Sequence, residues 1–248
     1  MKKNLGAIIL AAGKGTRMKS KNVNKVALHL ASKPMILHTV ELLESLSIKN
    51  IVVVVGFAKE SVINVLKGKV EFAEQKKRLG TAHAVKIALQ KFNNKTVDVL
   101  VLNGDDSAFY SKEVINKLAK KHFNNNSSFT FLTIEKDSPY GLGRVIRDKN
   151  GKVKAMVEEK DATNNERNIK EVNPGCYIFK VNFLKKYLPF VEKSPVTGEY
   201  YLTSLIGVGI KNNEKIETLK GGKLIWAGVN TKDEFSEAQK LISSFPQE

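Results

Sequence analysis

The chain has 248 residues, 42% hydrophobic and 27% charged, which is ordinary for a globular protein and argues against intrinsic disorder. No apolar run reaches the roughly 20 residues of a membrane-spanning helix, and the N-terminal apolar segment is too short for a signal peptide, so we expect a cytoplasmic protein with no membrane partner. The formal charge of +16 suggests nucleic-acid binding, but the lysines are scattered in pairs without interleaved aromatic residues, so we expect no nucleic-acid partner.

Hydrophobic runs bounded by turn residues predict the strands of the first two thirds of the chain. The runs are continuous rather than alternating, which indicates strands buried on both faces, as in a parallel sheet; they lie at residues 5–10, 50–56, 97–104, 127–135 and 173–181. Apolar residues at helical spacing predict helices between them, over residues 33–46, 59–67, 80–92 and 112–123. This alternation predicts an α/β protein with a doubly wound, mostly parallel sheet.

Past residue 136 the pattern changes to shorter elements. Residues 145–160 predict two short strands around an Asn150-Gly151 turn, a β-hairpin added to the main sheet as a lid region over the site. Further helices are predicted over residues 181–193, 198–212 and 231–245, and a late strand at Leu224, Ile225 and Trp226. No Pro- or Ser-rich linker interrupts the chain, so we expect residues 1–248 to form one domain.

A small, glycine-containing, cationic loop follows the first predicted strand. Its sequence, "LAAGKGTRM" over residues 10–18, lacks bulky side chains, which lets backbone N–H groups approach an anion closely. A Walker loop is excluded because no glycine stands at the required position, and a dinucleotide fingerprint is excluded because Met18 replaces its third glycine. The loop therefore predicts a different kind of nucleotide phosphate site.

Chemically distinctive residues also follow other predicted strands. Ligands of open α/β sheets bind beyond the carboxyl ends of the strands. Asp105 follows the strand at residues 97–104, Leu79-Gly80-Thr81 in the segment "AEQKKRLGTAHA" precede a helix, and Asn230 lies in "WAGVNT". Three basic residues at 76–78 lie within that segment, and the sequence leaves open whether they cover a nucleotide or extend into solvent.

Together these motifs resemble the sugar-nucleotide pyrophosphorylases, most closely the N-acetylglucosamine-1-phosphate uridyltransferases. The resemblance rests on the order of "LAAGKGTRM", Lys25, "AEQ", "LGTAHA", "NGD", "GRV", "VEEKDAT", "EVNPG", "GEYYLT" and "AGVN", and it spans almost the whole chain. It implies a Rossmann-like nucleotidyltransferase fold. In two-domain relatives a left-handed β-helix acetyltransferase domain follows, and we expect none here because the sequence ends at Glu248.

The resemblance implies a catalytic pair and a metal pair. Arg17 and Lys25 are expected to neutralise the triphosphate and the charge that develops during transfer, and Asp105 and Asn230 are expected to bind Mg²⁺. Hard oxygen ligands suit an ion that keeps several waters and bridges phosphates. The alternatives are structural: Asp105 caps a helix or a turn, and Asn230 caps the helix that begins near Lys232.

The resemblance also assigns substrate-binding residues. Base recognition falls to the backbone around Ala11, Ala12 and Gly13, to Gln75, and to Gly80 and Thr81; sugar recognition falls to Gly143, Glu158, Asn173, Tyr201 and Thr203; Leu10 and Asn103 complete the set. The alternative for Glu158 is an exposed charge on the hairpin. For His83, on the helix after Thr81, we expect a packed or capped core side chain rather than a catalytic role.

The implied activity is Mg²⁺-dependent transfer of a nucleotidyl group from UTP to N-acetylglucosamine-1-phosphate, giving UDP-N-acetylglucosamine and pyrophosphate. Two alternatives stay open: the same chemistry on another pair, such as glucose-1-phosphate with UTP or dTTP, and a regulatory protein that binds a nucleotide sugar without turnover. The sequence does not indicate an oligomeric state.

Overall fold

Four parallel strands form the N-terminal half of the central sheet. The computed structural model describes residues 4–15, 18 and 22–243. In the order β5-β4-β1-β6, the four strands are β5 (Glu71–Glu74), β4 (Ile51–Val55), β1 (Leu5–Ala11) and β6 (Asp98–Asn103). Leu10 of β1 lies opposite Val54 of β4 and Asn103 of β6, so the carboxyl ends of these strands meet at one edge. The strands and the parallel pairing predicted for this half are confirmed.

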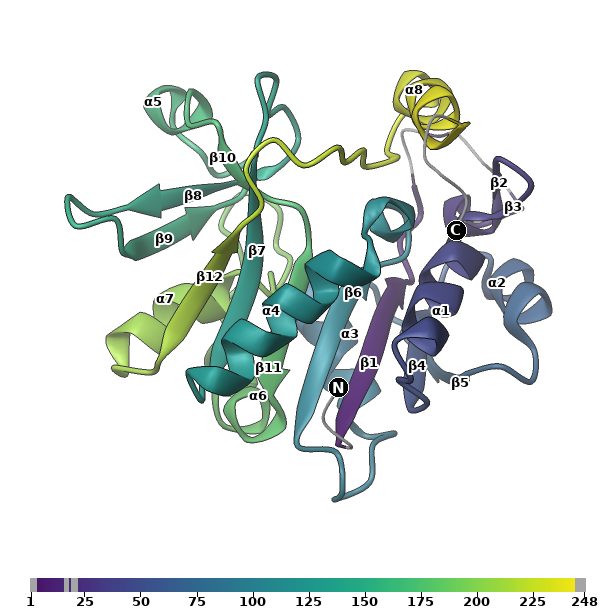
Figure 1. The fold of residues 1–248 in the computed structure, drawn as a ribbon, viewed down its shortest axis with the longest axis horizontal. Coiled ribbons are helices and arrows are strands. Elements are labelled where there is room, and N and C mark those ends of the chain that lie inside the picture. The colour runs from purple at the N-terminus through teal and green to yellow at the C-terminus, as the bar shows by residue number, and fades with distance from the viewer. Residues whose placement is uncertain (1–3, 16–17, 19–21, 244–248) are drawn as a thin grey trace.

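The sheet continues beyond β6 with a reversal of direction. Strand β11 (Cys176–Lys180) lies between β6 and β7 (Phe129–Glu135) and is antiparallel to both, while β12 (Ile216–Lys220) pairs with β7 in parallel. Strands β10 (Glu171–Asn173), β8 (Gly143–Arg147) and β9 (Val153–Val157) extend from β7 as antiparallel neighbours and form the separate left-hand part of the sheet in Figure 1. The predicted hairpin around Asn150-Gly151 is confirmed as β8–β9.

Helices cover both faces of the parallel half. One core lies between the sheet and helices α1 (Met35–Ser45), α2 (Lys59–Leu66) and α4 (Lys112–Asn124), and a second lies against α3 (Thr81–Leu89) and α6 (Val181–Tyr187). In Figure 1, α1 and α4 lie over the face toward the viewer. Consecutive residues of β1 serve opposite cores, with Ile8 in one and Ile9 in the other. Because both faces are buried, the strand sequence is continuously apolar.

The remaining elements are short or lie at the edges of the molecule. They are the 3-10 helices η2 (Lys25–Ala27), η3 (Ser107–Phe109) and η4 (Leu188–Phe190), the small sheet of β2 (His29–Leu30) and β3 (Lys33–Pro34), and helices α5 (Asn164–Arg167), α7 (Ser204–Lys211) and α8 (Lys232–Ser243). Across the described residues, every helix is too short or too polar to cross a bilayer.

Helix α8 packs against the small sheet of β2 and β3, far from it in the sequence. It lies beside β2 and β3 in Figure 1, where the Gln239 side chain accepts from the Ala31 N–H at 2.8 Å and donates to the His29 carbonyl at 2.8 Å. The segment that leads into α8 therefore lies next to the opening loop. This packing accompanies the approach of Asn230 to Lys25.

One strand prediction is confirmed over a shorter range, and another is wrong. The strand predicted at 173–181 is β11 (Cys176–Lys180); it starts later because Pro174 has no N–H to pair and Gly175 has φ of 85°, and Asn173 belongs to β10. Residues 224–226 form no strand. The strand that pairs with β7 is β12, which lies earlier in the chain. Residues 224–226 form an irregular segment in which Trp226 is buried and Ile225 is 56% exposed.

Two helices are shorter than predicted. The helix expected over 198–212 begins at Ser204, because the backbone of Tyr200 is bonded to the segment before α3: its N–H donates to the Leu79 carbonyl at 2.8 Å and its carbonyl accepts from the Ala82 N–H at 2.9 Å. The helix expected over 181–193 ends at Tyr187 and continues only as the 3-10 turn η4, which contains Pro189.

Candidate active site

A cleft of about 740 Å³ lies at the carboxyl edge of the parallel strands, between them and the β8–β10 part of the sheet. All but one of the predicted site residues line it: Leu10, Ala11, Ala12, Gly13, Lys25, Gln75, Gly80, Thr81, Asn103, Asp105, Gly143, Glu158, Asn173, Tyr201, Thr203 and Asn230. The exception, Arg17, lies outside the described residues. The structure thus brings the predicted set together, while the role of each residue stays a prediction.

The loop after β1 is held open by a buried asparagine. Asn24 is 1% exposed, and its Nδ2 donates to the carbonyls of Ala11 at 3.0 Å, Phe57 at 2.8 Å and Gly13 at 3.3 Å. Its Oδ1 accepts from the N–H of Val26 at 3.2 Å. One side chain therefore joins the loops that follow β1 and β4 and fixes the start of η2, which carries Lys25. Sequence reasoning missed this role of Asn24.

Lys25 lies at the centre of a polar cluster made by distant parts of the chain. Its ammonium forms an ion pair with Asp105 Oδ2 and donates to Asn230 Oδ1 at 2.8 Å and to the Val229 carbonyl at 2.6 Å. The side chains of Lys25 and Asp105 are 11% and 18% exposed. Reduced contact with water strengthens these charge interactions. The sequence separation of 205 residues between Lys25 and Asn230 hides this cluster from any local pattern.

Asn230 is not the cap of the last helix. The N–H of Glu234 donates to Thr231 Oγ1 at 3.1 Å, and the Glu234 carboxylate accepts from the N–H groups of Asn230 at 2.6 Å and Thr231 at 3.0 Å. This reciprocal arrangement makes Thr231 the capping residue. The structural alternative for Asn230 is therefore wrong, and its side-chain oxygen is directed at Lys25.

The oxygen donors of Asp105 and Asn230 fit a magnesium ion. Both contact the same ammonium nitrogen, so two hard oxygens from separate loops converge on one cationic point. The described residues contain no group of three or more His, Cys, Asp or Glu side chains suited to a metal. Two protein oxygens suit an ion that takes its other ligands from water and phosphate, as Mg²⁺ commonly does.

Gln75 and Gly80 form the opposite end of the cleft. Gln75 is 4% exposed, and its Nε2 lies 3.0 Å from the Gly80 carbonyl and 3.0 Å from His83 Nδ1. Gly80 has φ of 106°, and a Cβ there would lie 2.5 Å from the Tyr200 carbonyl, so only glycine fits. His83 is half-buried and bonded to a cleft residue, which corrects the expectation of a packed core histidine.

The third part of the cleft is lined by hydroxyl, amide and carboxylate groups. Glu158 Oε1 accepts from Thr203 Oγ1 at 2.7 Å, and Asn173 Oδ1 accepts from the Gly175 N–H at 3.1 Å. Tyr201 shares a 2.6 Å hydrogen bond with Thr197. Burial raises the pKa of Glu158, partly opposed by the Thr203 hydrogen bond. Glu158 is half-buried in the cleft, so the expectation of an exposed hairpin charge does not hold.

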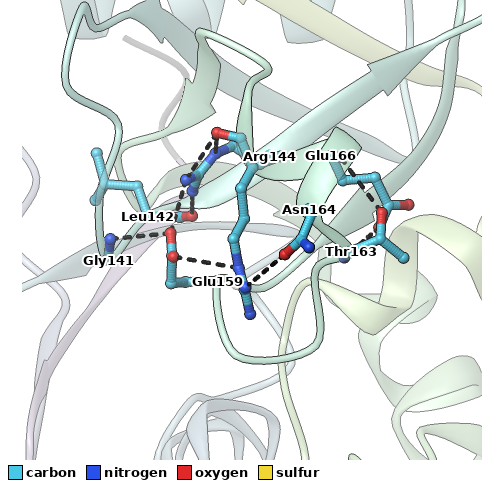
Figure 2. A network of polar contacts seen from close by, with 8 residues as sticks. Gly141, Leu142, Arg144, Glu159, Thr163, Asn164 and Glu166 are labelled. Carbon is cyan, nitrogen blue, oxygen red and sulfur yellow. Dashed lines mark hydrogen bonds and ion pairs between the residues drawn. The ribbon is translucent and has the colours of Figure 1, made fainter.

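A buried arginine, Arg144, is the centre of a polar network beside this third part of the cleft (Figure 2). Arg144 is 2% exposed; its guanidinium lies 2.7 Å from Glu159 Oε2 and also donates to the carbonyls of Leu142 and Arg167. Glu159 in turn accepts from the Gly141 N–H at 3.1 Å. The network therefore joins the loop before β8, next to Gly143, to the segment after β9, which carries Glu158. In the sequence, this network is indicated only by an arginine, Arg144, that lies within the run "GRVI".

Fold and site together define a nucleotidyltransferase, and the comparison with known families agrees: residues 6–244 match the model of the nucleotidyl transferase family. The chain belongs to this family, which confirms the resemblance seen in the sequence. Among curated proteins, it is 41% identical over 212 residues to the bifunctional protein GlmU of Carboxydothermus hydrogenoformans, covering 86% of this chain and 47% of that protein.

Other relatives give the same picture. The bifunctional protein GlmU of a Geobacillus strain is 40% identical over 237 residues, covering 95% of this chain and 51% of that protein. The chain thus spans about half the length of the curated relatives it matches. A Bacillus anthracis protein named as a glucose-1-phosphate thymidylyltransferase, crystallised with sucrose, has a TM-score of 0.82 and 22% identity, with 98% of this chain and 97% of that chain covered. This last likeness confirms the α/β fold with its mostly parallel sheet.

Proposed function

We propose that this chain catalyses transfer of the uridylyl group from UTP to N-acetylglucosamine-1-phosphate, with Mg²⁺, giving UDP-N-acetylglucosamine and pyrophosphate. The observation that carries the proposal is the convergence of Lys25, Asp105 and Asn230 on one point beside the glycine-containing loop. Family membership supports the reaction type. The resemblance of the motifs to N-acetylglucosamine-1-phosphate uridyltransferases supports the choice of base and sugar.

The reaction is a single displacement at phosphorus. A phosphate oxygen of the sugar-1-phosphate attacks the α-phosphorus of UTP and forms a new phosphorus–oxygen bond, while the bond from the α-phosphorus to the bridging oxygen breaks and pyrophosphate leaves with the electron pair. The nucleophile is already an anion and requires no general base. Catalysis therefore depends on bringing two anions together and stabilising the developing charge.

The residues around the loop suit this task. Lys25 is held by three oxygen partners in this structure, and when Asp105 and Asn230 bind Mg²⁺ its positive charge becomes available to neutralise phosphate oxygens. Asp105 and Asn230 would hold Mg²⁺, which when bound screens the negative charge of the triphosphate and polarises its phosphoryl oxygens. The backbone of Ala11 and Gly13 is held by Asn24 and leaves space for the nucleotide, because a Cβ at Gly13 would meet no atom within 4 Å. Arg17 is proposed as a second cation toward the triphosphate.

The far part of the cleft suits a sugar with polar substituents. Glu158 and Asn173 offer a carboxylate and an amide, and Thr203 and Tyr201 offer hydroxyl groups. Such groups impose specificity because a sugar lacking the matching partner leaves them unpaired in a desolvated site. We assign this part of the cleft to the sugar and the Gln75–Gly80 end to the base.

Pyrophosphate release tests the proposal directly. The purified chain is assayed with Mg²⁺ against UTP, dTTP, CTP, ATP and GTP, each combined with N-acetylglucosamine-1-phosphate and with glucose-1-phosphate. Asp105→Ala is the loss variant, and Asp137→Ala is its matched control, since Asp137 is an exposed carboxylate paired with exposed Lys170 at 3.0 Å. We expect turnover with UTP and the acetylated sugar that falls by at least about 100-fold in Asp105→Ala and is unchanged in Asp137→Ala.

Each other outcome selects one of the alternatives. Turnover with glucose-1-phosphate and UTP or dTTP keeps the chemistry and replaces the substrates. Absence of turnover from folded protein, combined with tight binding of a nucleotide sugar, favours the regulatory protein. Equal loss in both variants would show that the Asp105 effect is not specific to the cleft.

A further inference from the structure

The Gln75 side chain lies between two groups that fix which way its amide points. Its Nε2 is 3.0 Å from the Gly80 carbonyl and 3.0 Å from His83 Nδ1. The Gly80 carbonyl is itself held in place, because it also accepts from the Ala84 N–H at 3.2 Å in the first turn of α3. Gln75 is 4% exposed and lines the cleft, so a turn of its amide would change what the cleft presents.

The hydrogens that each group can donate determine the orientation of the Gln75 amide. A carbonyl oxygen only accepts, so the group that faces Gly80 is the amide NH₂. The second amide hydrogen points to His83 Nδ1, which therefore carries a lone pair, and the imidazole proton lies on Nε2. A reversed amide would place Oε1 against the Gly80 oxygen, an acceptor, and would require the other His83 tautomer, with the proton on Nδ1. The observed orientation is the one that satisfies both contacts.

As a consequence, the Gln75 Oε1 atom is left to accept a hydrogen bond from a ligand. Both hydrogens of the Gln75 amide are used inside the protein, and no described residue donates to its Oε1. Gln75 lines the cleft, so its remaining hydrogen-bonding capacity is that of an acceptor at the end assigned to the base. Uracil and thymine carry a hydrogen on ring nitrogen N3, whereas the same nitrogen of cytosine is an acceptor.

We propose that His83 is a positioning residue that holds the Gln75 amide with Oε1 toward the nucleotide, and that it thereby makes the site select pyrimidines with a hydrogen on N3 over cytosine. The inference rests on the proposed function in that a nucleotide base occupies this end of the cleft. It adds a residue that touches no substrate and acts through Gln75.

The surroundings of His83 agree with a neutral imidazole. Burial lowers the pKa of His83, and the positive charge of Lys86, one turn further along α3, lowers it further. Protonation at Nδ1 would place two donors against each other and release the amide. Lys86 is exposed on the same helix and supplies a control position that leaves the Gln75 contact intact.

Three variants separate positioning from a general structural role. His83→Leu removes the acceptor. His83→Asn keeps an acceptor oxygen near the place of Nδ1 and is the conservative rescue. Lys86→Gln changes the same helix without touching Gln75. For each variant, kcat and KM are measured for UTP and CTP at saturating sugar phosphate, and KM for the sugar phosphate is measured at saturating UTP.

In His83→Leu, we expect the ratio of kcat/KM for UTP to that for CTP to fall by about 5- to 10-fold, with the loss in KM for UTP, because one of the two hydrogen bonds that orient the amide is gone. The KM for the sugar phosphate stays within about twofold of the wild-type value. His83→Asn restores most of the ratio, and Lys86→Gln leaves it unchanged. An unchanged ratio in His83→Leu, or equal losses for UTP and the sugar phosphate, overturns the proposal.

A measurement on the unmodified protein covers the case in which His83→Leu does not fold. The ¹⁵N chemical shifts of the His83 imidazole distinguish its tautomers, and we expect the proton on Nε2; a proton on Nδ1 contradicts the proposal. The two inferences also fail separately. If the unmodified protein prefers dTTP with glucose-1-phosphate, the proposed substrates are wrong, while the role of His83 still requires dTTP and UTP to be preferred over CTP.

Discussion

Removing the Asn24 side chain tests whether the cleft depends on one buried amide. In Asn24→Ala, the carbonyls of Ala11, Phe57 and Gly13 lose their shared donor, and the Val26 N–H loses its acceptor. A net loss of about 1 kcal/mol for each of the stronger contacts gives a reduction in the free energy of unfolding of about 2–4 kcal/mol. Because Asn24 caps η2, which carries Lys25, we also expect a lower kcat/KM.

The assay is urea unfolding followed by circular dichroism, with the free energy of unfolding taken from the linear extrapolation. Asn212→Ala is the matched control: Asn212 is exposed and its Nδ2 makes one hydrogen bond, to the Val208 carbonyl at 2.8 Å, so its loss is expected to cost about 0.5 kcal/mol or less. Asn24→Asp separates hydrogen bonding from packing, since it keeps the shape but removes the donors.

The reasoning fails if Asn24→Ala loses no more stability than Asn212→Ala. It also fails if Asn24→Asp retains the stability of the unmodified protein at pH 7, because a carboxylate facing three carbonyls is unfavourable when the amide donors matter. A stable Asn24→Ala with reduced activity would place the role of Asn24 in the geometry of the loop alone.

Three further predictions concern the other parts of the cleft. Arg144→Met removes the nearer of the two arginines paired with Glu159 and leaves Arg167 at 3.7 Å; we expect a stability loss of about 2–3 kcal/mol in urea unfolding and a KM increase for the sugar phosphate that exceeds the increase for UTP. Burial raises the pKa of Glu158 in the folded state, so its ionisation lowers the stability of the folded protein as pH rises through the range between the unfolded and folded pKa. Glu158→Gln should therefore raise Tm at pH 7 and leave it nearly unchanged at pH 3.5. An equal shift at both pH values would contradict this. Gly80→Ala places a methyl group against the Tyr200 carbonyl at a positive φ, and we expect a loss of at least about 2 kcal/mol; wild-type stability would refute the close approach.

Local hydrophobic patterns predicted most of the central strands and helices. The strands β1, β4 and β6 are buried on both faces, and each therefore forms an uninterrupted apolar run that is visible without tertiary information. The errors lie where a pattern is shared by two arrangements. An apolar segment such as residues 173–181 does not specify the direction of its neighbour, and Trp226 is buried as an anchor in an irregular segment rather than in a strand.

The candidate site was predicted through its motifs, and the supporting residues were not. Every predicted site residue within the described part of the chain lines one cleft, because residues at the carboxyl ends of parallel strands share an edge. Arg144 and His83 lie within the motifs "GRV" and "LGTAHA" and Asn24 lies outside the motifs, but the sequence assigned a supporting role to none of them. Each acts on groups whose identity depends on the packing of neighbouring segments, and such contacts leave no periodicity in the sequence.

The sequence by itself determined the class of fold and the chemical groups available, since burial on both sheet faces and a glycine-containing loop are local requirements. Tertiary structure decided how those groups meet. The packing of α8 against β2 accompanies the approach of Asn230 Oδ1 to 2.8 Å from Lys25 Nζ, and the contacts with Gly80 and His83 occupy the Gln75 amide nitrogen. The reason is physical: a hydrogen bond constrains the position and direction of both partners, and these are set by the packed chain as a whole.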